Sequence, residues 1–151
     1  MNPSSMWGSS IILLLLFALS AFFSGCETVL SSLSPIQVQR IRNRHAAAGR
    51  RLEALLADPA LILSTLLVGN SLVNFAIASL GYVLIESLIP RWGEAVAIPF
   101  MTVSLLLVGD VTPKRIAIIH AERLAPVCSK LLLFWLWLLR PFNVVLTSGS
   151  R

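Results

Sequence analysis

Three long apolar runs, separated by polar turns, dominate the hydrophobic and polar pattern of the chain. They cover about residues 10–33, 59–88 and 95–111. Each is long enough to cross a bilayer as a helix, which needs about 17–25 apolar residues. Asp58 and Pro59 give the second run a clear start, because Asp can cap a helix and Pro suits the first helical position. The pattern therefore predicts an all-α membrane protein with three transmembrane helices.

The segments that follow the first and third runs are more polar and predict helices at the membrane surface. Residues 34–58 predict short amphipathic belt helices on the cytoplasmic side, broken near Gly49. Residues 114–140 predict a juxtamembrane helix, because Pro126 and Lys130 interrupt the apolar run and leave too short a stretch to span by itself. A fourth span is the alternative for this last segment.

Composition supports a membrane protein, with 56% hydrophobic and only 13% charged residues. The net charge of +5 comes from basic residues that flank the apolar runs. Residues 34–58 and the pair Lys114–Arg115 are basic, whereas the turn at residues 89–94 is neutral. The positive-inside rule then places the N-terminus outside and the C-terminal part in the cytoplasm, as expected for a multi-pass protein of the cell (inner) membrane. The lipid bilayer explains this basic charge, and we expect no nucleic-acid partner.

Polar residues within the first run lie on one helical face. Ser20, Ser24, Glu27 and Ser31 follow one another in steps of four, three and four, and Gly25 beside them would let another helix approach closely. Serine and glycine often join membrane helices, so helix–helix adhesion is one interpretation. An ionisable residue inside a span points to a functional site, although Glu27 is close enough to the inner end to pair with an arginine.

The second run carries two asparagines one helical turn apart, Asn70 and Asn74. Gly69 precedes Asn70, and Ser71 follows it. Amides in membrane helices can join helices by hydrogen bonds. Two stacked amides beside a glycine can also present carbonyl oxygens to a ligand. Both interpretations remain open for this run.

The third run ends in a combination that is costly at membrane depth: Gly109, Asp110 and Pro113. Proline has no N–H, so inside an α-helix it leaves the carbonyl four residues earlier, that of Gly109, without its partner. Asp110 adds a carboxylate, and one cation would satisfy both groups. The alternative is an ordinary helix end, with Asp110 paired to Lys114 or Arg115.

Together the three runs supply oxygen donors that suit a hard cation. Hydroxyl, amide, carbonyl and carboxylate oxygens favour Mg²⁺, Ca²⁺ or Na⁺ over Zn²⁺ or Cu⁺. The predicted ligands are Ser24, Asn70, Asn74, Gly109 and Asp110, and Pro113 is the predicted helix break. We expect no enzyme, because the sequence offers no nucleophile–base pair.

The motifs "FFSGCETVLSSLS", "LSTLLVGNSLVN" and "VGDVTPKRIAIIHAERLA" resemble the membrane domain of the CNNM/CorC family of magnesium transporters, over about residues 11–144. The family pattern more often has glutamate where this chain has Asp110, and many relatives have a polar residue at Cys26. The resemblance implies a homodimer in which each subunit binds and exports Mg²⁺, with Na⁺ influx as the driver. Carried over by motif, it implies the same five ligands.

Residues 1–146 are thus expected to form the transmembrane domain, with 147–151 as a linker or added tail. The CBS and C-terminal domains of relatives are expected to be absent. The expected function is Na⁺/Mg²⁺ exchange by alternating access. A Mg²⁺ channel, or a non-transporting anchor or ion sensor, are the alternatives. Further pathway or sodium-site candidates, which no spacing selects, are Ser20, Gly25, Glu27, Ser31, Ser64, Thr65, Ser71 and Gly81.

Overall fold

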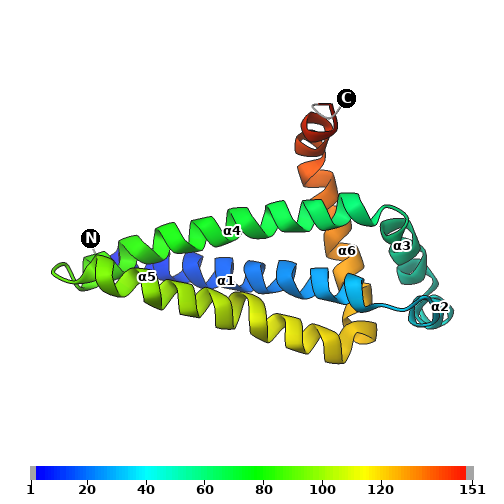
Figure 1. The fold of residues 1–151 in the computed structure, drawn as a ribbon, viewed down its shortest axis with the longest axis horizontal. Helices are drawn as coiled ribbons and strands as arrows, with labels where there is room; N and C mark the ends of the chain where they lie inside the picture. Colours follow the sequence, from blue (N-terminus) through cyan, green and yellow to red (C-terminus); the bar gives the residue numbers. More distant parts are fainter. Residues whose placement is uncertain (1–2, 149–151) are drawn as a thin grey trace. The chain divides into compact units, whose positions relative to one another are not determined.

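The computed structural model describes residues 3–148, with side chains for residues 5–138, and this part of the chain is almost entirely helical (Figure 1). The elements are α1 (Pro3–Ser32), α2 (Pro35–Arg44), α3 (Ala46–Leu56), α4 (Pro59–Leu88), α5 (Gly93–Ser104), the π-helix η1 (Leu105–Val111) and α6 (Thr112–Ser148). Within the described residues, three helical stretches are long and apolar enough to cross a membrane: Ser5–Ser32, Pro59–Leu88 and Gly93–Leu138. The predicted all-α fold with three spans is confirmed. Of the predicted tail, residues 149–151 lie outside the described residues.

The chain divides into two compact units, which are described in turn. The first unit combines Met1–Gly25 with Gly69–Arg115, and so contains most of α1, the later part of α4, α5 and η1. The second combines Cys26–Val68 with Ile116–Arg151, and so contains α2, α3, the start of α4 and most of α6.

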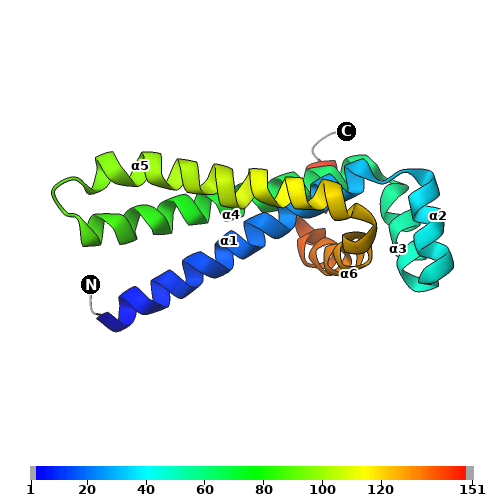
Figure 2. The ribbon, with the colours of Figure 1, turned by 90° about the horizontal axis from the view of Figure 1, so that it is seen from below.

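In the first unit, α4 and α5 form a helical hairpin, and α1 enters between α4 and η1 towards residue 25 (Figures 1 and 2). Gly93 allows the hairpin to close, since a side chain there would lie only 2.7 Å from the Cα of Glu86. The core between the helices contains Val73, Ile77 and Met101, each with little or no exposed surface. The opposite end of α1 diverges from the hairpin (Figure 2).

Large apolar side chains of the first unit also point away from its core. Phe75 is 74% exposed, and Leu14 and Phe100 are exposed to a similar degree. Contiguous exposed apolar surface on this scale is rare on soluble monomers. On helices that span a bilayer, by contrast, these side chains meet lipid. The exposed apolar faces, like the length and composition of the helices, therefore indicate that they span a membrane.

In the second unit, α2 and α3 pack together as the amphipathic pair that the arginine-rich segment predicts. Ser34 caps α2 in a capping box with Gln37: the Gln37 N–H donates to Ser34 Oγ, and the Ser34 N–H donates to Gln37 Oε1 at 2.9 Å. The predicted break near Gly49 is wrong, because α2 ends at Arg44 and Gly49 lies inside α3. Gly49 is needed there for close packing, since a side chain would collide with the backbone of Arg42.

The helix α6 also belongs largely to the second unit and buries one regular face. Ala117, Ala121, Ala125, Cys128 and Leu132 recur in steps of three or four and are almost fully buried. The helix continues through Pro126, so proline does not divide the predicted juxtamembrane segment. Its helical geometry is interrupted at His120 instead, where φ is −117° and ψ is 22°. Whether this segment lies on the membrane stays a prediction.

Candidate cation-binding site

Two serines of α1, Ser20 and Ser24, are the centre of the candidate site in the first unit. They lie one helical turn apart, on the same face, and neither has any exposed surface. A buried hydroxyl in a membrane helix needs a hydrogen-bond partner, because neither lipid nor apolar side chains can supply one. Each serine finds its partner on a different neighbouring helix.

Ser20 faces the two asparagines of α4. Its hydroxyl donates to Asn74 Oδ1 at 2.6 Å and lies 3.3 Å from Asn70 Oδ1. Asn70 and Asn74 are one turn apart, so both amide oxygens reach the same hydroxyl. We call Ser20, Asn70 and Asn74 the amide cluster. Its polar atoms carry no formal charge.

Ser24 faces the π-helix η1. Its hydroxyl donates to Asp110 Oδ1 at 2.7 Å and lies 3.4 Å from the backbone carbonyl oxygen of the same residue. The ammonium nitrogen of Lys114 lies 3.0 Å from that carboxylate oxygen. We call Ser24, Asp110 and Lys114 the carboxylate cluster. The helix-end pairing of Asp110 with Lys114, the alternative drawn from the sequence, is therefore present in the structure.

Gly109 lies next to both clusters. It is buried, and a Cβ atom added to it would lie 2.9 Å from Ser20 Oγ, a member of the amide cluster. Its neighbour in sequence, Asp110, belongs to the carboxylate cluster. The absence of a side chain at Gly109 thus lets η1 approach α1 closely enough for both serines to be covered.

The predicted break at Pro113 takes a different form from the one that the sequence suggests. The helical path continues into α6, and a π-helical segment precedes the proline. The N–H of Thr112 donates to the carbonyl of Leu107, five residues earlier. In a π segment each N–H bonds to the carbonyl five residues earlier instead of four. The carbonyl that lacks an N–H partner because of Pro113 is therefore no longer identified by counting back four residues. A ligand role for the Gly109 carbonyl stays a prediction.

The oxygen types in the two clusters are those that a small hard cation prefers. Octahedral Mg²⁺ with metal–oxygen distances of 2.0–2.1 Å holds neighbouring ligand oxygens about 2.9 Å apart. The oxygen pairs within each cluster are separated by 2.6–3.4 Å, and each pair is joined by a hydrogen bond that a bound Mg²⁺ would have to replace. The carboxylate of Asp110 supplies the formal negative charge.

The structure gathers Ser20, Ser24, Asn70, Asn74, Gly109 and Asp110 in the first unit. Gly25 borders the same site, with Pro113 atoms about 4.0 Å from where its side chain would begin. Ser71 points outward on α4, and Gly81 packs against Met101 instead of the clusters.

Of the other sodium-site candidates, Ser31, Ser64 and Thr65 lie in the second unit, and their hydroxyls bond within their own helices. Glu27 lies in the same unit and is half-buried. Ser31 donates to the carbonyl of Glu27 at 2.8 Å. Ser64 and Thr65 both donate to the carbonyl of Leu61. These bonds give no indication of a sodium site.

Sequence reasoning underestimated Ser20, which was only a secondary candidate but makes both amide contacts. The signal that could have identified it is its spacing, four residues before Ser24 on the polar face of the first run.

The family model for the cyclin M transmembrane N-terminal domain matches residues 11–150. The chain belongs to this family. It is 33% identical over 122 residues to a UPF0053 protein of Haemophilus influenzae, covering 81% of this chain and 29% of the relative. It is 32% identical over 133 residues to the UPF0053 inner membrane protein YfjD of Escherichia coli, covering 88% and 31%. A chloroplastic DUF21 domain-containing protein of Arabidopsis thaliana is 31% identical over 140 residues, covering 93% and 21%.

Membership of the cyclin M transmembrane family confirms the resemblance drawn from the three motifs. With its three apolar helices, the chain is a multi-pass membrane protein. It spans less than a third of the length of these curated relatives.

Proposed function

We propose that the chain moves Mg²⁺ across the membrane, exporting it from the cytoplasm in exchange for Na⁺ by alternating access. The observation that carries the proposal is the meeting of hydroxyl, amide and carboxylate oxygens from α1, α4 and η1 at buried serines. Polar groups within spans are costly and mark ion pathways. Membership of the cyclin M family, which handles Mg²⁺, supports the same conclusion.

Each group has a distinct role in this proposal. Asp110 attracts the ion through its charge, while Asn70 and Asn74 replace oxygens of the hydration shell. Ser20 and Ser24 turn their hydroxyl oxygens towards the ion once their protons rotate away. Mg²⁺ loses water reluctantly and prefers six ligands, so a retained water or the Gly109 carbonyl completes the shell.

Lys114 gives the site a built-in competitor. The ammonium nitrogen of Lys114 lies 3.0 Å from Asp110 Oδ1. An incoming Mg²⁺ therefore displaces the ammonium from the carboxylate as it binds. When the ion leaves, the ammonium returns and the half-exposed carboxylate regains a partner of opposite charge. The site therefore binds Mg²⁺ with modest affinity, as a carrier that must release its ion requires.

The proposed arrangement in the membrane follows the basic residues. The arginine-rich helices α2 and α3 face the cytoplasm, and the N-terminus lies outside. The bilayer is the cell (inner) membrane, and two copies of the chain form a homodimer, as the family resemblance implies. The chain is a transporter and has no enzymatic activity of its own.

Flux measurements in proteoliposomes test the proposal. We expect Mg²⁺ efflux that an inward Na⁺ gradient drives uphill, and that Asp110→Ala abolishes. Asp110→Glu is the matched control, because it keeps the charge and should keep most of the flux. Correct assembly of each variant is checked by its elution volume and helical circular dichroism.

The alternatives give different results. Flux that only follows the Mg²⁺ gradient and ignores Na⁺ would identify a channel. Absence of flux in the wild type, together with aggregation of Asp110→Asn, would favour an anchor whose polar face joins helices. Normal flux in a well-folded Asp110→Ala variant would contradict the proposed site.

A further inference from the structure

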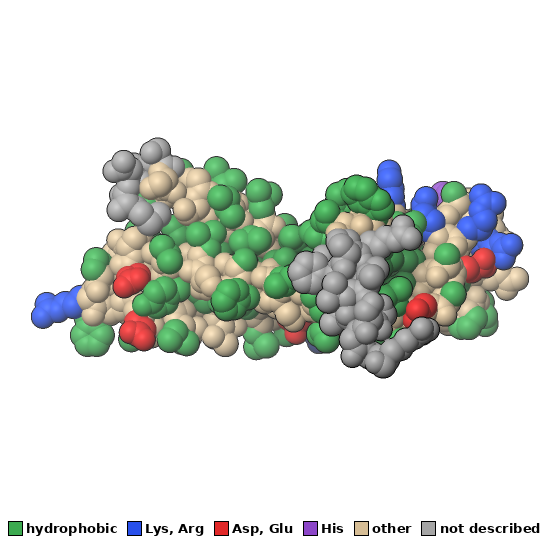
Figure 3. Space-filling view, turned by 90° about the horizontal axis from the view of Figure 1, so that it is seen from above, with side chains coloured by type: hydrophobic (Ala, Val, Ile, Leu, Met, Phe, Trp, Pro, Cys, Tyr) green, Lys and Arg blue, Asp and Glu red, His purple; other side chains and the backbone are tan. Residues whose placement is uncertain are grey.

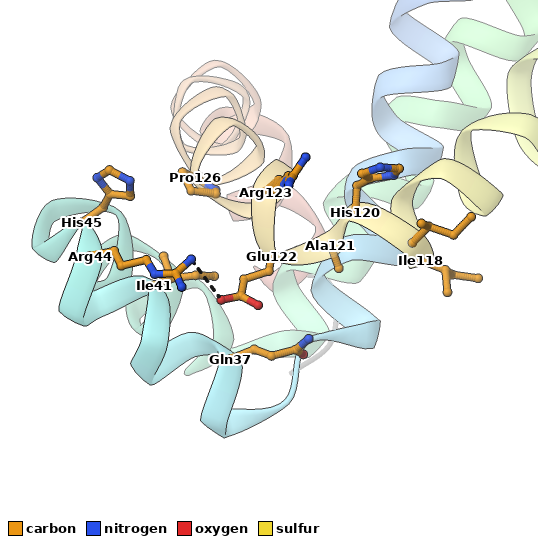
Figure 4. A pocket seen from close by; sticks show the side chains of 11 residues that line it. Gln37, Ile41, Arg44, His45, Ile118, His120, Ala121, Glu122, Arg123 and Pro126 are labelled. Carbon is orange, nitrogen blue, oxygen red and sulfur yellow. Dashed lines mark ion pairs between the residues drawn. The ribbon is translucent and has the colours of Figure 1, made fainter.

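A cavity of about 610 Å³ lies in the second unit, outside the candidate cation site (Figure 4). One wall is α2, from Gln37 in its first turn to Arg44 at its end. The other is the segment of α6 around its kink, residues 118–126. The irregular backbone at His120 turns α6 at this point, so that residues on both sides of the kink line one cavity. A volume of this size suits a small-molecule ligand or a lipid headgroup.

Positive charge predominates in the cavity. Arg44 and Arg123 line it together with a single carboxylate, that of Glu122. Figure 4 shows the Arg44 and Glu122 side chains directed towards each other, with 3.9 Å between Arg44 Nη1 and Glu122 Oε1. That separation is long for an ion pair, and a guanidinium has five N–H donors, so Arg44 retains donors for a further acceptor. Figure 4 shows the exposed Arg123 side chain extending away from Arg44, so an anion held at Arg44 meets the second guanidinium only after that side chain turns towards it.

The same cavity has an apolar rim. Ile118 and Ile119 line it on α6 and are 62% and 75% exposed. Exposed isoleucines beside arginines suit a ligand with a negative headgroup and an apolar chain. A soluble phosphate compound would gain nothing from the isoleucines.

The surface around the cavity is also basic. Figure 3 shows Lys and Arg side chains gathered over the part of the second unit that carries α2 and α3. The exposed arginines of these two helices include Arg40, Arg42, Arg44 and Arg50. Basic clusters beside spans attract the anionic lipids of the inner leaflet, and basic pockets between helices bind their headgroups.

We propose that this cavity binds the phosphate headgroup of an anionic phospholipid through Arg44 and through Arg123, whose exposed side chain turns towards the headgroup, with Ile118 and Ile119 against the acyl chains. The lipid would connect α2 to α6 across the kink. This site is separate from the cation ligands and does not depend on the proposed transport activity.

Lipid titration of the purified protein in detergent, followed by native mass spectrometry, tests the site. The probes are phosphatidylglycerol, phosphatidylcholine as the uncharged comparison, and glycerol 3-phosphate as a soluble competitor. We expect phosphatidylglycerol to bind, and the double variant Arg44→Gln/Arg123→Gln to weaken that binding at least about tenfold, because both charge-assisted contacts are lost.

The matched control is Arg40→Gln/Arg50→Gln, which removes the same charge from α2 and α3 but leaves the cavity lining intact. It should bind phosphatidylglycerol nearly as the wild type does. Arg44→Lys/Arg123→Lys retains the charge and should fall between the two, which also guards against misfolding of the glutamine variant.

Three results would overturn the proposal. An equal loss in both glutamine variants would mean general attraction to a basic surface. Displacement of the lipid by glycerol 3-phosphate at similar concentrations would mean that a soluble phosphate is the ligand. Equal binding of phosphatidylcholine and phosphatidylglycerol would mean that the arginines do not recognise the headgroup charge.

Discussion

The amide cluster and the carboxylate cluster start from the same residue type on the same helix, yet they offer a cation different environments. Ser20 meets two neutral amide oxygens of α4, whereas Ser24 meets a carboxylate that already holds an ammonium. The neutral cluster can discriminate by geometry, since its oxygens must replace hydration water. The charged cluster supplies attraction, but its internal cation limits that attraction. We therefore expect selectivity and affinity to respond to different substitutions.

The largest expected effect comes from removing the charge of the carboxylate cluster. Asp110→Asn should weaken Mg²⁺ binding about a hundredfold, on the order of 3 kcal/mol, because it removes the formal charge among the proposed ligands. Calorimetry on the purified protein measures this, with Asp110→Glu as the charge-retaining control. Unchanged affinity in Asp110→Asn would mean that the amide cluster, or another site, holds the ion.

The amide cluster should respond less strongly, and its two amides should differ. Asn74→Ala should weaken Mg²⁺ binding about tenfold, since a neutral ligand contributes less than a charged one. Asn70→Ala should cost less than Asn74→Ala, because Asn70 Oδ1 lies 3.3 Å from Ser20 Oγ and Asn74 Oδ1 lies at 2.6 Å. The same calorimetric titration ranks the two variants. The reverse order would show that the ion approaches from the Asn70 side.

Gly109 lies next to both clusters, so a substitution there tests how close packing affects stability and Mg²⁺ binding. Gly109→Ala places a methyl group 2.9 Å from Ser20 Oγ, and overpacking of this kind costs about 1–3 kcal/mol of stability. We expect a lower melting temperature and Mg²⁺ binding weakened several-fold. Adding Ser20→Ala should restore most of the melting temperature, because it removes the atom that collides. Failure of this rescue would mean that the methyl group acts on the backbone of η1 instead.

The smallest expected effect is a gain in Mg²⁺ affinity instead of a loss. Lys114→Met removes the internal competitor of the carboxylate cluster and should tighten Mg²⁺ binding about two- to fivefold, since a half-exposed ion pair contributes at most about 1 kcal/mol. Ser24 still donates to Asp110, so the carboxylate keeps one partner. Titration of Lys114→Met beside Arg115→Met, a neighbouring basic residue that is exposed, separates competition from a general charge effect. Weaker binding in Lys114→Met would mean that Lys114 positions Asp110 for the ion.

Features that depend on near neighbours in the chain were predictable. Asp58 accepts a hydrogen bond from the N–H of Leu61 at 3.1 Å, as expected of a cap at the start of α4. Asn70 and Asn74 reach the same partner, as residues one turn apart should. The i,i+4 spacing of Asp110 and Lys114 likewise made their pairing a foreseeable alternative.

Features that depend on packing between helices were not predictable from the sequence. Gly49 looked like a helix break, but it is the point where α3 packs against α2. Pro113 looked like a break, but a π segment before it absorbs the change in hydrogen-bond register. The actual irregularity at His120 carries no glycine or proline signal at that position. Glycine and proline indicate where a helix can bend or end, whereas packing against the neighbouring helices decides whether it does.

By itself, the amino-acid sequence determined the helical runs, their apolar length and the faces on which Ser20, Ser24, Asn70 and Asn74 lie, because these follow from periodicity within one helix. Only the tertiary structure decided that Ser20 meets the amides and Ser24 meets Asp110. Those partners are separated by 50 to 86 residues along the chain. The rotation of each helix about its axis decides which side chains meet. In this protein close packing sets that rotation, through a glycine on η1 that admits the serine face of α1.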